Sequence, residues 1–458
     1  MLPYKITTYP FIRAARRPYK MVQGFLSAFV FGFPSRRIKV IGITGTTGKT
    51  TTIHLTAVGL QSAGYKVGVA SSIRIQIGTK VEKNKSGLTS LGPWTIQKLL
   101  ARMVKAGCHY AVIEVSSHAL DQCRFWGVDF DVAVITNLYR DHLDYHHTLD
   151  DYAFAKKRLF KAVSQRASKY INRKYVPKII IASLDDPKTR DFLSENADFR
   201  YGVTLLDPTK PTPPRTEPVY LYSARIMPDK TTAVVMVKGR NSLIRLKLPG
   251  SFNVRNALCA LAVGVSQNIA VDRVARELSE VEIIPGRFER VDEGQPFQAV
   301  VDYAVTEAAL QTLYGTIKAM RPRRVLAVFG ACGNRDRGKR PGMAKIVARH
   351  SDVVFLTNED PFSEDPEQIF SDLKKGFHEG GLRESYLDSL EKDGNKIFIK
   401  ISDRREAIRA AINEAKPGDI VVATGKGAEE VMRFKDKTIP WNEAGIFREE
   451  LKKKYGNT

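Results

Sequence analysis

Cysteine is scarce in this sequence, and the spacing of the few that occur argues against two common kinds of site. The chain of 458 residues contains four cysteines. No two of them form a C-x-x-C pair, so neither a zinc ribbon nor a redox-active dithiol is expected. Isolated cysteines in a chain of this length are typical of a reducing cytoplasm. We expect small buried side chains at Cys108, Cys123, Cys259 and Cys332.

Long apolar runs are also missing. The stretch Met21–Phe33 is apolar and follows a basic segment, but it is shorter than the roughly 20 residues that cross a bilayer. It has no small-residue cleavage site and leads straight into a predicted strand, which argues against a secretion signal. We expect a helix packed on the body of the protein, with a helix in a membrane interface as the alternative. The expected location is the cytoplasm, with peripheral contact to an anionic membrane under that alternative.

Acidic residues are too few to balance the basic ones. Lysine and arginine number 72 against 49 aspartates and glutamates, which leaves a net charge of +23. No zinc finger, aromatic RNA-binding strand or basic heptad accompanies this excess, so no specific nucleic-acid partner is expected. A solvated basic surface, attracted to phosphates and acidic lipid, explains it better.

The sequence predicts an α/β fold. Residues 38–44 form an apolar, β-branched run typical of a buried strand, and a helical pattern follows from about Thr50 to Ala63. A second helix is expected at 95–107, and further strands at Lys66–Ala70, Tyr110–Glu114 and Asp131–Thr136. Such alternation is typical of a parallel sheet covered on both faces.

The following region differs in pattern. Within residues 175–250, alternating apolar residues at Ala233–Val237 and Leu243–Leu248 predict a small antiparallel patch, and Pro208–Pro218 predicts a loop. A helix is expected at Asn253–Val265.

We place a domain boundary near Ile283–Pro285. The expected organisation is an N-terminal segment at 1–37, a first α/β domain at 38–284 and a second, Rossmann-like domain at 285–458. Short apolar strands define the second domain, at Ala299–Asp302, Arg324–Phe329, Val353–Leu356, Lys396–Ile399 and Ile420–Ala423.

A glycine-rich loop carries the first chemical signal. It consists of Gly45, Thr46, Thr47, Gly48, Lys49, Thr50 and Thr51, and it stands between a predicted strand and a predicted helix, as a phosphate-binding loop must. Backbone N–H groups and the helix N-terminus would hold phosphate oxygens. Lys49 would reach the β- and γ-phosphates of ATP, and the Thr50 hydroxyl would hold Mg²⁺. Ile43 replaces the first glycine of the general G-x-x-x-x-G-K-[ST] pattern.

Three later residues suit a metal site facing that loop. Glu114 ends a predicted strand, His142 lies in the loop after the next one, and Lys156 starts a helical pattern. Carboxyl ends of parallel strands line the ligand crevice of an open sheet, and a carboxylate there suits Mg²⁺. Taken alone, Glu114 is better explained as a helix cap, His142 as a loop histidine and Lys156 as a lysine on a solvated face. Their order after a phosphate loop favours the metal site.

These segments resemble the Mur ligases, and most closely the UDP-N-acetylmuramoyl-tripeptide synthetases. The resemblance covers about residue 38 to the end, in GTTGKTTT, EVSSHAL, TNLYRDHLDYHHTLDDYAFAKKRLF, PGSFNVRNALCALAVG, PGRFERV, VDYA, GACGNRDRGKRPGM and ATGKGAEE. It implies a central ATPase domain at 38–284 and a C-terminal domain at 285–458. It also implies an ATP-dependent acid–amino-acid ligase that activates a cell-wall precursor as an acyl phosphate, with Mg²⁺ neutralising the transferring phosphoryl group.

The resemblance also implies roles for individual residues. Lys49, Glu114, His142 and Lys156 match the catalytic set, with Thr50 as a further metal ligand and Lys156 as the lysine that relatives carry as a carbamate. The remaining matches are ATP contacts at Asn253, Asn256, Arg287 and Asp302, precursor contacts at Thr89, Ser90, Ser116 and Arg124, and amino-acid contacts at Arg335, Asp360, Gly425 and Glu429.

The sequence departs from the family in three places. Only 37 residues precede the first predicted strand, too few for the family's N-terminal domain that holds the uridine nucleotide. This raises the hypothesis that the chain docks on a membrane and uses a lipid-linked precursor. The D-N-P-R motif of meso-diaminopimelate ligases has Phe362 in place of arginine, so lysine, another diamine or a neutral amino acid is expected instead. Val305 and Ala428 stand where relatives have histidine.

Other functions remain open from sequence. The folylpolyglutamate, cyanophycin and pseudomurein ligases share the phosphate loop but use other acceptors. A non-catalytic nucleotide-binding scaffold is a further alternative, which the intact Lys49, Glu114, His142 and Lys156 disfavour. The oligomeric state is not predicted.

Overall fold

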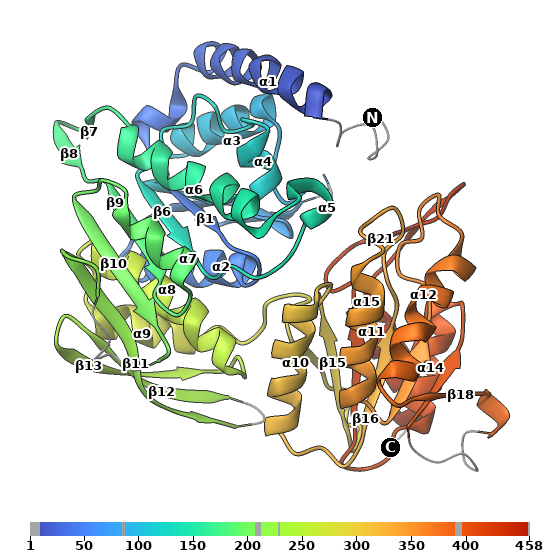
Figure 1. The fold of residues 1–458 in the computed structure, drawn as a ribbon. Helices are drawn as coiled ribbons and strands as arrows, with labels where there is room; N and C mark the ends of the chain where they lie inside the picture. The colour runs from blue at the N-terminus through green and yellow to red at the C-terminus, as the bar shows by residue number, and fades with distance from the viewer. Residues whose placement is uncertain are drawn as a thin grey trace. The chain divides into compact units, whose positions relative to one another are not determined.

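The computed structural model describes residues 10–84, 86, 88–206, 212–227, 230–389 and 396–456. The chain falls into two compact units, residues 1–282 and 283–458. Each unit has its own sheet and its own hydrophobic core (Figure 1).

The first unit is built on one large sheet, 11-stranded over the described residues, in the order β13-β12-β11-β10-β9-β6-β1-β5-β2-β3-β4. Its strands from β2 to β11 in that row run parallel, and hairpins extend both edges. Their bounds are β1 Lys39–Thr44, β2 Val67–Ala70, β3 Arg74–Ile77, β4 Lys80–Lys83, β5 Tyr110–Glu114, β6 Val132–Ile135, β9 Ile179–Ser183, β10 Phe199–Thr204, β11 Thr216–Ile226, β12 Thr231–Val237 and β13 Arg240–Leu246. A separate hairpin joins β7 Lys169–Ile171 and β8 Lys174–Val176.

Helices cover both faces of this sheet. One face packs on α3 Pro93–Lys105 and α6 Leu149–Gln165, whose apolar residues join Ala111, Ile113 and Ile135 in one core. The other face carries α2 Lys49–Ser62, α8 Ser251–Ser266 and α9 Val271–Ser279, which pack together (Figure 1). Shorter helices are α4 Ser117–Asp121, α5 Leu143–His146, α7 Pro187–Arg190 and the 3₁₀ turns Pro34–Arg37 and Asp191–Ser194.

The first helix, α1 Pro10–Val30, lies on the outside of this unit against α3 (Figure 1). It begins well before the apolar stretch Met21–Phe33 from which we expected a packed helix. None of the described helices is both long enough and apolar enough to span a membrane.

The second unit contains a seven-stranded sheet over its described residues, in the order β14-β15-β20-β16-β17-β19-β18. The edge strand β14 is antiparallel and the others run parallel. The strands are β14 Glu289–Val291, β15 Gln298–Asp302, β16 Val325–Phe329, β17 Val353–Leu356, β18 Arg383–Ser385, β19 Ile397–Lys400 and β20 Ile420–Thr424, with a hairpin of β21 Val431–Arg433 and β22 Thr438–Pro440. The helices are α10 Glu307–Ala319, α11 Lys339–His350, α12 Pro366–Glu379, α14 Arg404–Glu414 and α15 Glu443–Tyr455, with a 3₁₀ turn at Leu387–Ser389.

The predicted α/β class is confirmed, and so is the predicted antiparallel patch, whose runs at Ala233–Val237 and Leu243–Leu248 overlap β12 and β13. Elsewhere within residues 175–250, β9 and β10 continue the parallel sheet, and β12 pairs antiparallel with both β11 and β13 on the same sheet. Buried apolar runs such as Ile179–Ser183 do not reveal strand direction, which the partner strand sets. Part of the proline-rich stretch, 207–211, lies outside the described residues, and its end enters β11 at Thr216 rather than a loop.

The cysteine prediction is half right. All four are free thiols; Cys108 and Cys259 are buried, whereas Cys123 and Cys332 are partly exposed.

Candidate functional site

Three neighbouring strand ends bring the predicted residues of the first unit together. β1 lies between β5 and β6, with Ile43 opposite Glu114 and Thr44 opposite Ile135. Because all three strands are parallel, the segments that follow them start at the same edge of the sheet. The loop after Thr44, the carboxylate of Glu114 and the segment after Ile135 are therefore neighbours.

The loop from Gly45 to Gly48 requires glycine at both ends. Gly45 has φ of 146°, and a Cβ there would lie 2.0 Å from the Thr136 hydroxyl oxygen. Gly48 has φ of 79°, and a Cβ there would lie 2.3 Å from Asn256 Oδ1. Both backbone conformations disfavour residues with a side chain. The glycines thus allow a tight cradle of backbone N–H groups at the start of α2, of the kind that holds phosphate.

Asn137 fixes the middle of the loop. Its carbonyl oxygen accepts from Thr46 N at 3.1 Å, and its Oδ1 accepts from Thr47 N at 3.0 Å. The Thr46 hydroxyl accepts from Tyr139 N at 2.9 Å, and the Thr136 hydroxyl donates to the Thr47 carbonyl at 2.6 Å. The residues that directly follow β6 therefore hold the loop in place through these hydrogen bonds.

Helix α8 supplies two predicted nucleotide contacts beside this loop. Asn256 Nδ2 donates to Asn253 Oδ1 at 3.3 Å, and Asn256 Oδ1 accepts from the Thr52 hydroxyl at 3.3 Å. Both asparagines are buried. Asn256 therefore lies against the first turn of α2 and against Gly48.

Thr50 and Glu114 are in direct contact. The Thr50 hydroxyl lies 3.2 and 3.3 Å from the two carboxylate oxygens of Glu114, and Ser72 N donates to Glu114 Oε2 at 2.7 Å. A hydroxyl and a carboxylate at a phosphate loop are the hard oxygen ligands that Mg²⁺ takes. No group of three or more His, Cys, Asp or Glu side chains suited to a metal occurs in the described parts of the chain. An ion here would therefore complete its shell with phosphate and water oxygens, as Mg²⁺ commonly does.

Two lysines converge on one carbonyl of the loop. Lys156 Nζ donates to the Gly45 carbonyl at 2.8 Å, and Lys49 Nζ donates to the same oxygen at 3.0 Å. Lys156 is only 1% exposed, and its ammonium lies 4.4 Å from the centre of the Tyr152 ring. Burial, reinforced by the nearby charge of Lys49 and opposed by Asp141, holds the pKa of Lys156 well below its usual value. Lys156 is thus predisposed to lose its proton.

His142 lies near the ring of Tyr152, which Lys156 also contacts. Its ring centroid is 6.1 Å from the ring of Tyr152 and 4.7 Å from the ring of His118. His142 Nε2 lies 3.3 Å from Asp141 Oδ2, and the residue has φ of 54°. Of the four expected metal ligands, Thr50 and Glu114 touch each other, whereas the aromatic ring of Tyr152 connects His142 to Lys156.

Three of the four predicted precursor contacts form one cluster. The Ser90 hydroxyl donates to the Glu114 carbonyl and accepts from Ser116 N, each at 2.9 Å, and Arg124 Nη1 donates to the Ser90 carbonyl at 3.3 Å. Thr89 precedes Ser90 and is exposed. The cluster therefore contacts the main chain of Glu114.

In the second unit, Asp302 holds the segment after residue 286. Its Oδ2 accepts from Phe288 N at 2.7 Å, and its carbonyl accepts from Gly425 N at 3.2 Å. Burial raises the pKa of Asp302 to about 6, opposed by the positive charge of Arg287. The Arg287 guanidinium lies 4.7 Å from the centre of the Tyr303 ring.

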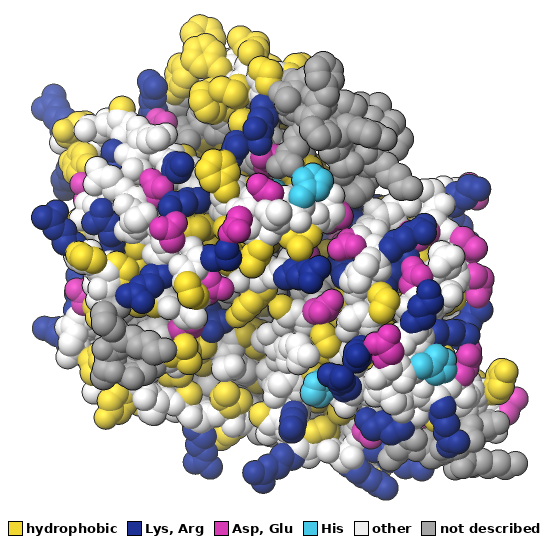
Figure 2. Space-filling view, in the orientation of Figure 1, with side chains coloured by type: hydrophobic (Ala, Val, Ile, Leu, Met, Phe, Trp, Pro, Cys, Tyr) yellow, Lys and Arg dark blue, Asp and Glu magenta, His cyan; other side chains and the backbone are white. Residues whose placement is uncertain are grey.

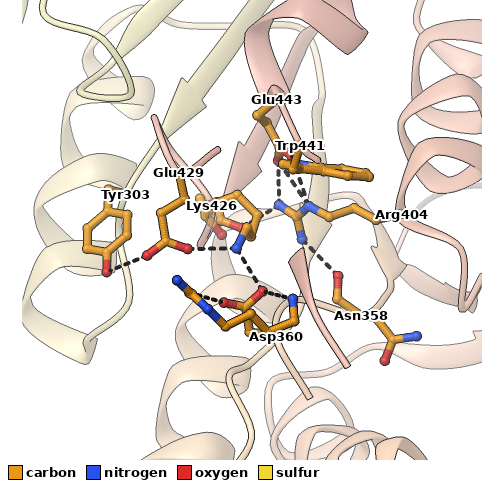
Figure 3. A network of polar contacts seen from close by, with 10 residues as sticks. Tyr303, Asn358, Asp360, Arg404, Lys426, Glu429, Trp441 and Glu443 are labelled. Carbon is orange, nitrogen blue, oxygen red and sulfur yellow. Dashed lines mark hydrogen bonds and ion pairs between the residues drawn. The ribbon is translucent and has the colours of Figure 1, made fainter. Parts of the chain in front are cut away.

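A charge network around the buried Lys426 joins two of the predicted amino-acid contacts, Asp360 and Glu429 (Figure 3). Lys426 Nζ donates to Asp360 Oδ1 at 2.8 Å and to Glu429 Oε2 at 2.6 Å, and the Tyr303 hydroxyl donates to Glu429 Oε1 at 3.3 Å. Gly425 has φ of 107°, and a Cβ there would lie 2.7 Å from Glu359 Oε2. The fourth predicted contact, Arg335, is exposed on the loop after β16.

Sequence reasoning missed several residues of this network. Glu359 is buried, and burial raises its pKa to about 7, opposed by Lys426 and Arg404. Arg404 pairs with Glu443 and donates to the Thr424 carbonyl at 2.7 Å (Figure 3). Lys426 lies in the quoted GKG segment and was available as a signal. Arg404 stands at the start of a helix with no motif around it, so only the fold connects it to the site.

Comparison with known proteins matches both units. The Mur ligase middle domain matches residues 43–264, and the Mur ligase glutamate ligase domain matches residues 286–427. The resemblance inferred from motifs is thereby confirmed.

Individual relatives match over nearly the whole chain. A UDP-N-acetylmuramyl-tripeptide synthetase of Roseiflexus sp. (strain RS-1) is 36% identical over 431 residues, which are 93% of this chain and 81% of the relative. A UDP-N-acetylmuramoyl-L-alanyl-D-glutamate--2,6-diaminopimelate ligase of Geobacillus thermodenitrificans (strain NG80-2) is 35% identical over 439 residues, 95% of this chain and 83% of the relative. A solved structure of a ligase of that second kind superposes with a TM-score of 0.59 and 30% identity, covering 92% of this chain and 79% of that one.

Proposed function

The chain belongs to the Mur ligase family of ATP-dependent ligases, and from this premise we propose that it joins an amino acid to the terminal carboxylate of a cell-wall precursor. The precursor is a UDP-N-acetylmuramoyl peptide or its lipid-linked counterpart. The product is a new amide bond, formed through an acyl phosphate.

One observation carries this proposal. Two lysines, one of them fully buried, meet at the Gly45 carbonyl beside the Thr50–Glu114 contact. Structural lysines are seldom buried without a carboxylate partner. The positive charge of Lys49 and the backbone N–H groups of the loop suit the transfer of a phosphoryl group, whose oxygens carry the developing charge.

The reaction proceeds in two steps. The precursor carboxylate attacks the γ-phosphorus of ATP, the bond to the β-phosphate oxygen breaks, and ADP leaves. The amine of the amino acid then attacks the acyl carbon, phosphate leaves with the bonding pair, and the nitrogen loses a proton. Lys49 and the loop hold the phosphates in this scheme, while Asn253, Asn256, Arg287 and Asp302 contact the nucleotide.

Thr50 and Glu114 would hold Mg²⁺, which neutralises phosphate charge when bound. His142, together with Glu114, belongs to a second proposed metal position, and Lys156 is the lysine proposed to carry a carbamate there. The lowered pKa of Lys156 favours the neutral amine, the form that reacts with carbon dioxide to give a carbamate. A carbamate would convert this cation into an anion able to face a metal.

The amino acid is proposed to bind in the second unit at Arg335, Asp360, Gly425 and Glu429. The acidic side chains of Asp360 and Glu429 flank Lys426 and suit the ammonium group of the incoming substrate. Phe362 stands where meso-diaminopimelate ligases carry arginine. We therefore propose lysine, another diamine or a neutral amino acid as the substrate.

Phosphate release from ATP tests this function. The protein is incubated with ATP, Mg²⁺ and each of a panel of amino acids. The precursor added is UDP-N-acetylmuramoyl dipeptide, its lipid-linked counterpart or neither. The mass of the precursor is then measured by mass spectrometry. Stimulation by one precursor and one amino acid, with the matching mass gain, is expected. Tight ATP binding without stimulation by either precursor would refute the proposal and favour another acceptor or a scaffold.

A further inference from the structure

Helix α1 is fixed on the first unit through its small residues. A Cβ at Gly24 would lie 2.4 Å from the Trp126 carbonyl oxygen, and one at Gly127 would lie 2.9 Å from the Gly24 carbonyl oxygen. Ser27 and Ala28 are fully buried. So close a contact needs small side chains, which means that Gly24, Ser27 and Ala28 form the inward face of the helix.

The opposite face of α1 is apolar and exposed. We define the outer face of α1 as Tyr19, Val22, Phe25, Leu26, Phe29 and Val30, which are between 47% and 66% exposed. Their spacing of three and four residues places them along one side of the helix. Hydrophobic side chains gather over α1 in Figure 2. An ordinary surface helix turns its large apolar residues inward and its polar residues outward, and α1 does the reverse.

Two exposed tryptophans lie next to other residues of this part of the chain. Trp126 is 48% exposed and contacts Gly24, and Trp94 is 43% exposed with its ring centroid 6.4 Å from that of Phe31. Tryptophan and tyrosine prefer the boundary between lipid and water, because their rings are apolar and carry one polar group. The patch therefore has the composition of an interfacial anchor.

Exposed basic side chains lie on the elements next to the outer face of α1. Lys98 and Arg102 are exposed on α3, one and two turns after Trp94, on the same side of that helix. Arg36 and Arg37 are exposed just after α1, and the Arg36 guanidinium lies 4.7 Å from the centre of the Phe33 ring. The chain as a whole carries a net charge of +23. Such charge complements an anionic surface and adds to the attraction from apolar burial.

We propose that the outer face of α1 docks this protein on an anionic lipid bilayer, with Phe25 and Phe29 among the acyl chains and the neighbouring basic residues against the headgroups. Apolar and basic residues side by side fit a charged bilayer better than a second copy of the chain, which would bring like charges together. The proposed docking involves neither the phosphate loop nor the second unit, so it can be tested independently of the proposed ligase activity.

Co-sedimentation of the full chain with vesicles tests the proposal. Vesicles of phosphatidylcholine alone are compared with vesicles that also contain phosphatidylglycerol, at low and physiological salt. The test variant is Phe25→Ser/Phe29→Ser. Its matched control is Tyr170→Ser/Phe199→Ser, which removes two exposed aromatic side chains of 61% and 52% exposure elsewhere on the same unit. Thermal unfolding and ATP binding confirm that both variants are folded.

Binding to the anionic vesicles is expected for the wild type and the control, with about a tenfold loss in the test variant. Arg37→Glu is expected to weaken binding and to flatten its salt dependence. Equal binding of the control and test variants would overturn the proposal, as would equal binding to neutral and anionic vesicles. A concentration-dependent dimer that the test variant abolishes, without vesicle binding, would assign the face to a second copy of the chain and also overturn it.

Discussion

At the scale of single residues, the contact between Thr50 and Glu114 shows how two distant segments make one candidate metal site. The threonine starts a helix and the glutamate ends a strand, and the parallel register of β1 and β5 brings them to 3.2 Å. The local sequence points to each residue separately but not to their contact. Their chemistry depends on the shared edge of the sheet.

Replacing Thr50 by valine tests that site. The change keeps the shape of the side chain but removes the hydroxyl, so Mg²⁺-dependent phosphate release is expected to fall by about 10² or more. Thr56→Val is the matched control, because Thr56 is also buried in α2 but lies away from the loop. Equal rates in both variants would argue against a ligand role for Thr50.

Glu359→Gln should show a pH-dependent effect on stability. Burial raises the pKa of Glu359 to about 7, so the folded protein retains a proton that the unfolded chain releases from about pH 4.5 upward. The protonated carboxyl group of Glu359 therefore makes its full contribution to the free energy of unfolding at low pH, and this contribution is lost as the pH rises through about 7. Glutamine cannot ionise, so the free energy of unfolding of the variant relative to wild type should rise by about 2 kcal/mol from pH 5 to pH 8. Urea unfolding at both pH values checks this, and a constant difference would contradict it.

Phe362→Arg tests the basis of amino-acid choice. The new guanidinium can pair with the second carboxylate of meso-diaminopimelate, so turnover with that substrate should rise at least about tenfold relative to lysine. Arg433 already lies 6.0 Å from the Phe362 ring and pairs with Asp360 at 3.6 Å. Preference of the wild type for meso-diaminopimelate would refute our proposal that this amino acid is not the substrate. Loss of that preference in Arg433→Ala would then assign the pairing with the second carboxylate to Arg433.

At the scale of elements, α1 shows that a helix can be attached by its smallest residues. Its apolar stretch alone indicated a helix packed on the body of the protein. The packing face consists instead of Gly24, Ser27 and Ala28, and the large residues point away. Periodicity reveals which residues share a face, but it does not reveal which face is buried.

A pair of helical glycines tests the attachment of α1. Gly24→Ala places a methyl group 2.4 Å from the Trp126 carbonyl oxygen and should lower the free energy of unfolding of the first unit by about 1–3 kcal/mol. Gly315→Ala in α10 meets open space, so it should stabilise the second unit by about 0.5–1 kcal/mol. Chemical denaturation measures both. Similar effects in the two variants would show that Gly24 does not hold α1 in place.

At the scale of the whole molecule, the two units have independent cores. Residues such as Ile113, Ile135 and Phe160 form the core of the first, and residues such as Val328, Phe355 and Val421 form that of the second. The candidate phosphate loop lies entirely in the first unit, whereas Asp360 and Glu429 lie in the second. Under the proposed site assignment, ligation requires both units.

Producing the units separately tests this division. Residues 1–282 and 283–458 should each unfold cooperatively, because each buries its own sheet. The first unit alone should bind ATP, and neither unit alone should release phosphate in response to precursor and amino acid. Precursor-stimulated release by residues 1–282 alone would contradict the assignment of the amino-acid site to the second unit.

The fold class, the family and the candidate phosphate loop could be predicted from the amino-acid sequence, because the signals for them are local. A buried β-branched strand followed by GTTGKTT is a contiguous pattern, and so is the strand that ends in Glu114. The fold class, the family and the candidate loop depend on such contiguous patterns. They need no knowledge of which distant segments meet.

Other features depended on contacts between distant segments. The direction of β9 and β10, the burial of Lys156 against the Gly45 carbonyl and the inclusion of Arg404 in the charge network each join residues far apart in the chain. The inward packing of the small residues of α1 is a further example, because nothing in the sequence around Gly24 indicates that Trp126 lies against it. Strand direction, pKa shifts and the exposed face of a helix depend on neighbours in space. They could therefore not be predicted from the order of residues along the chain.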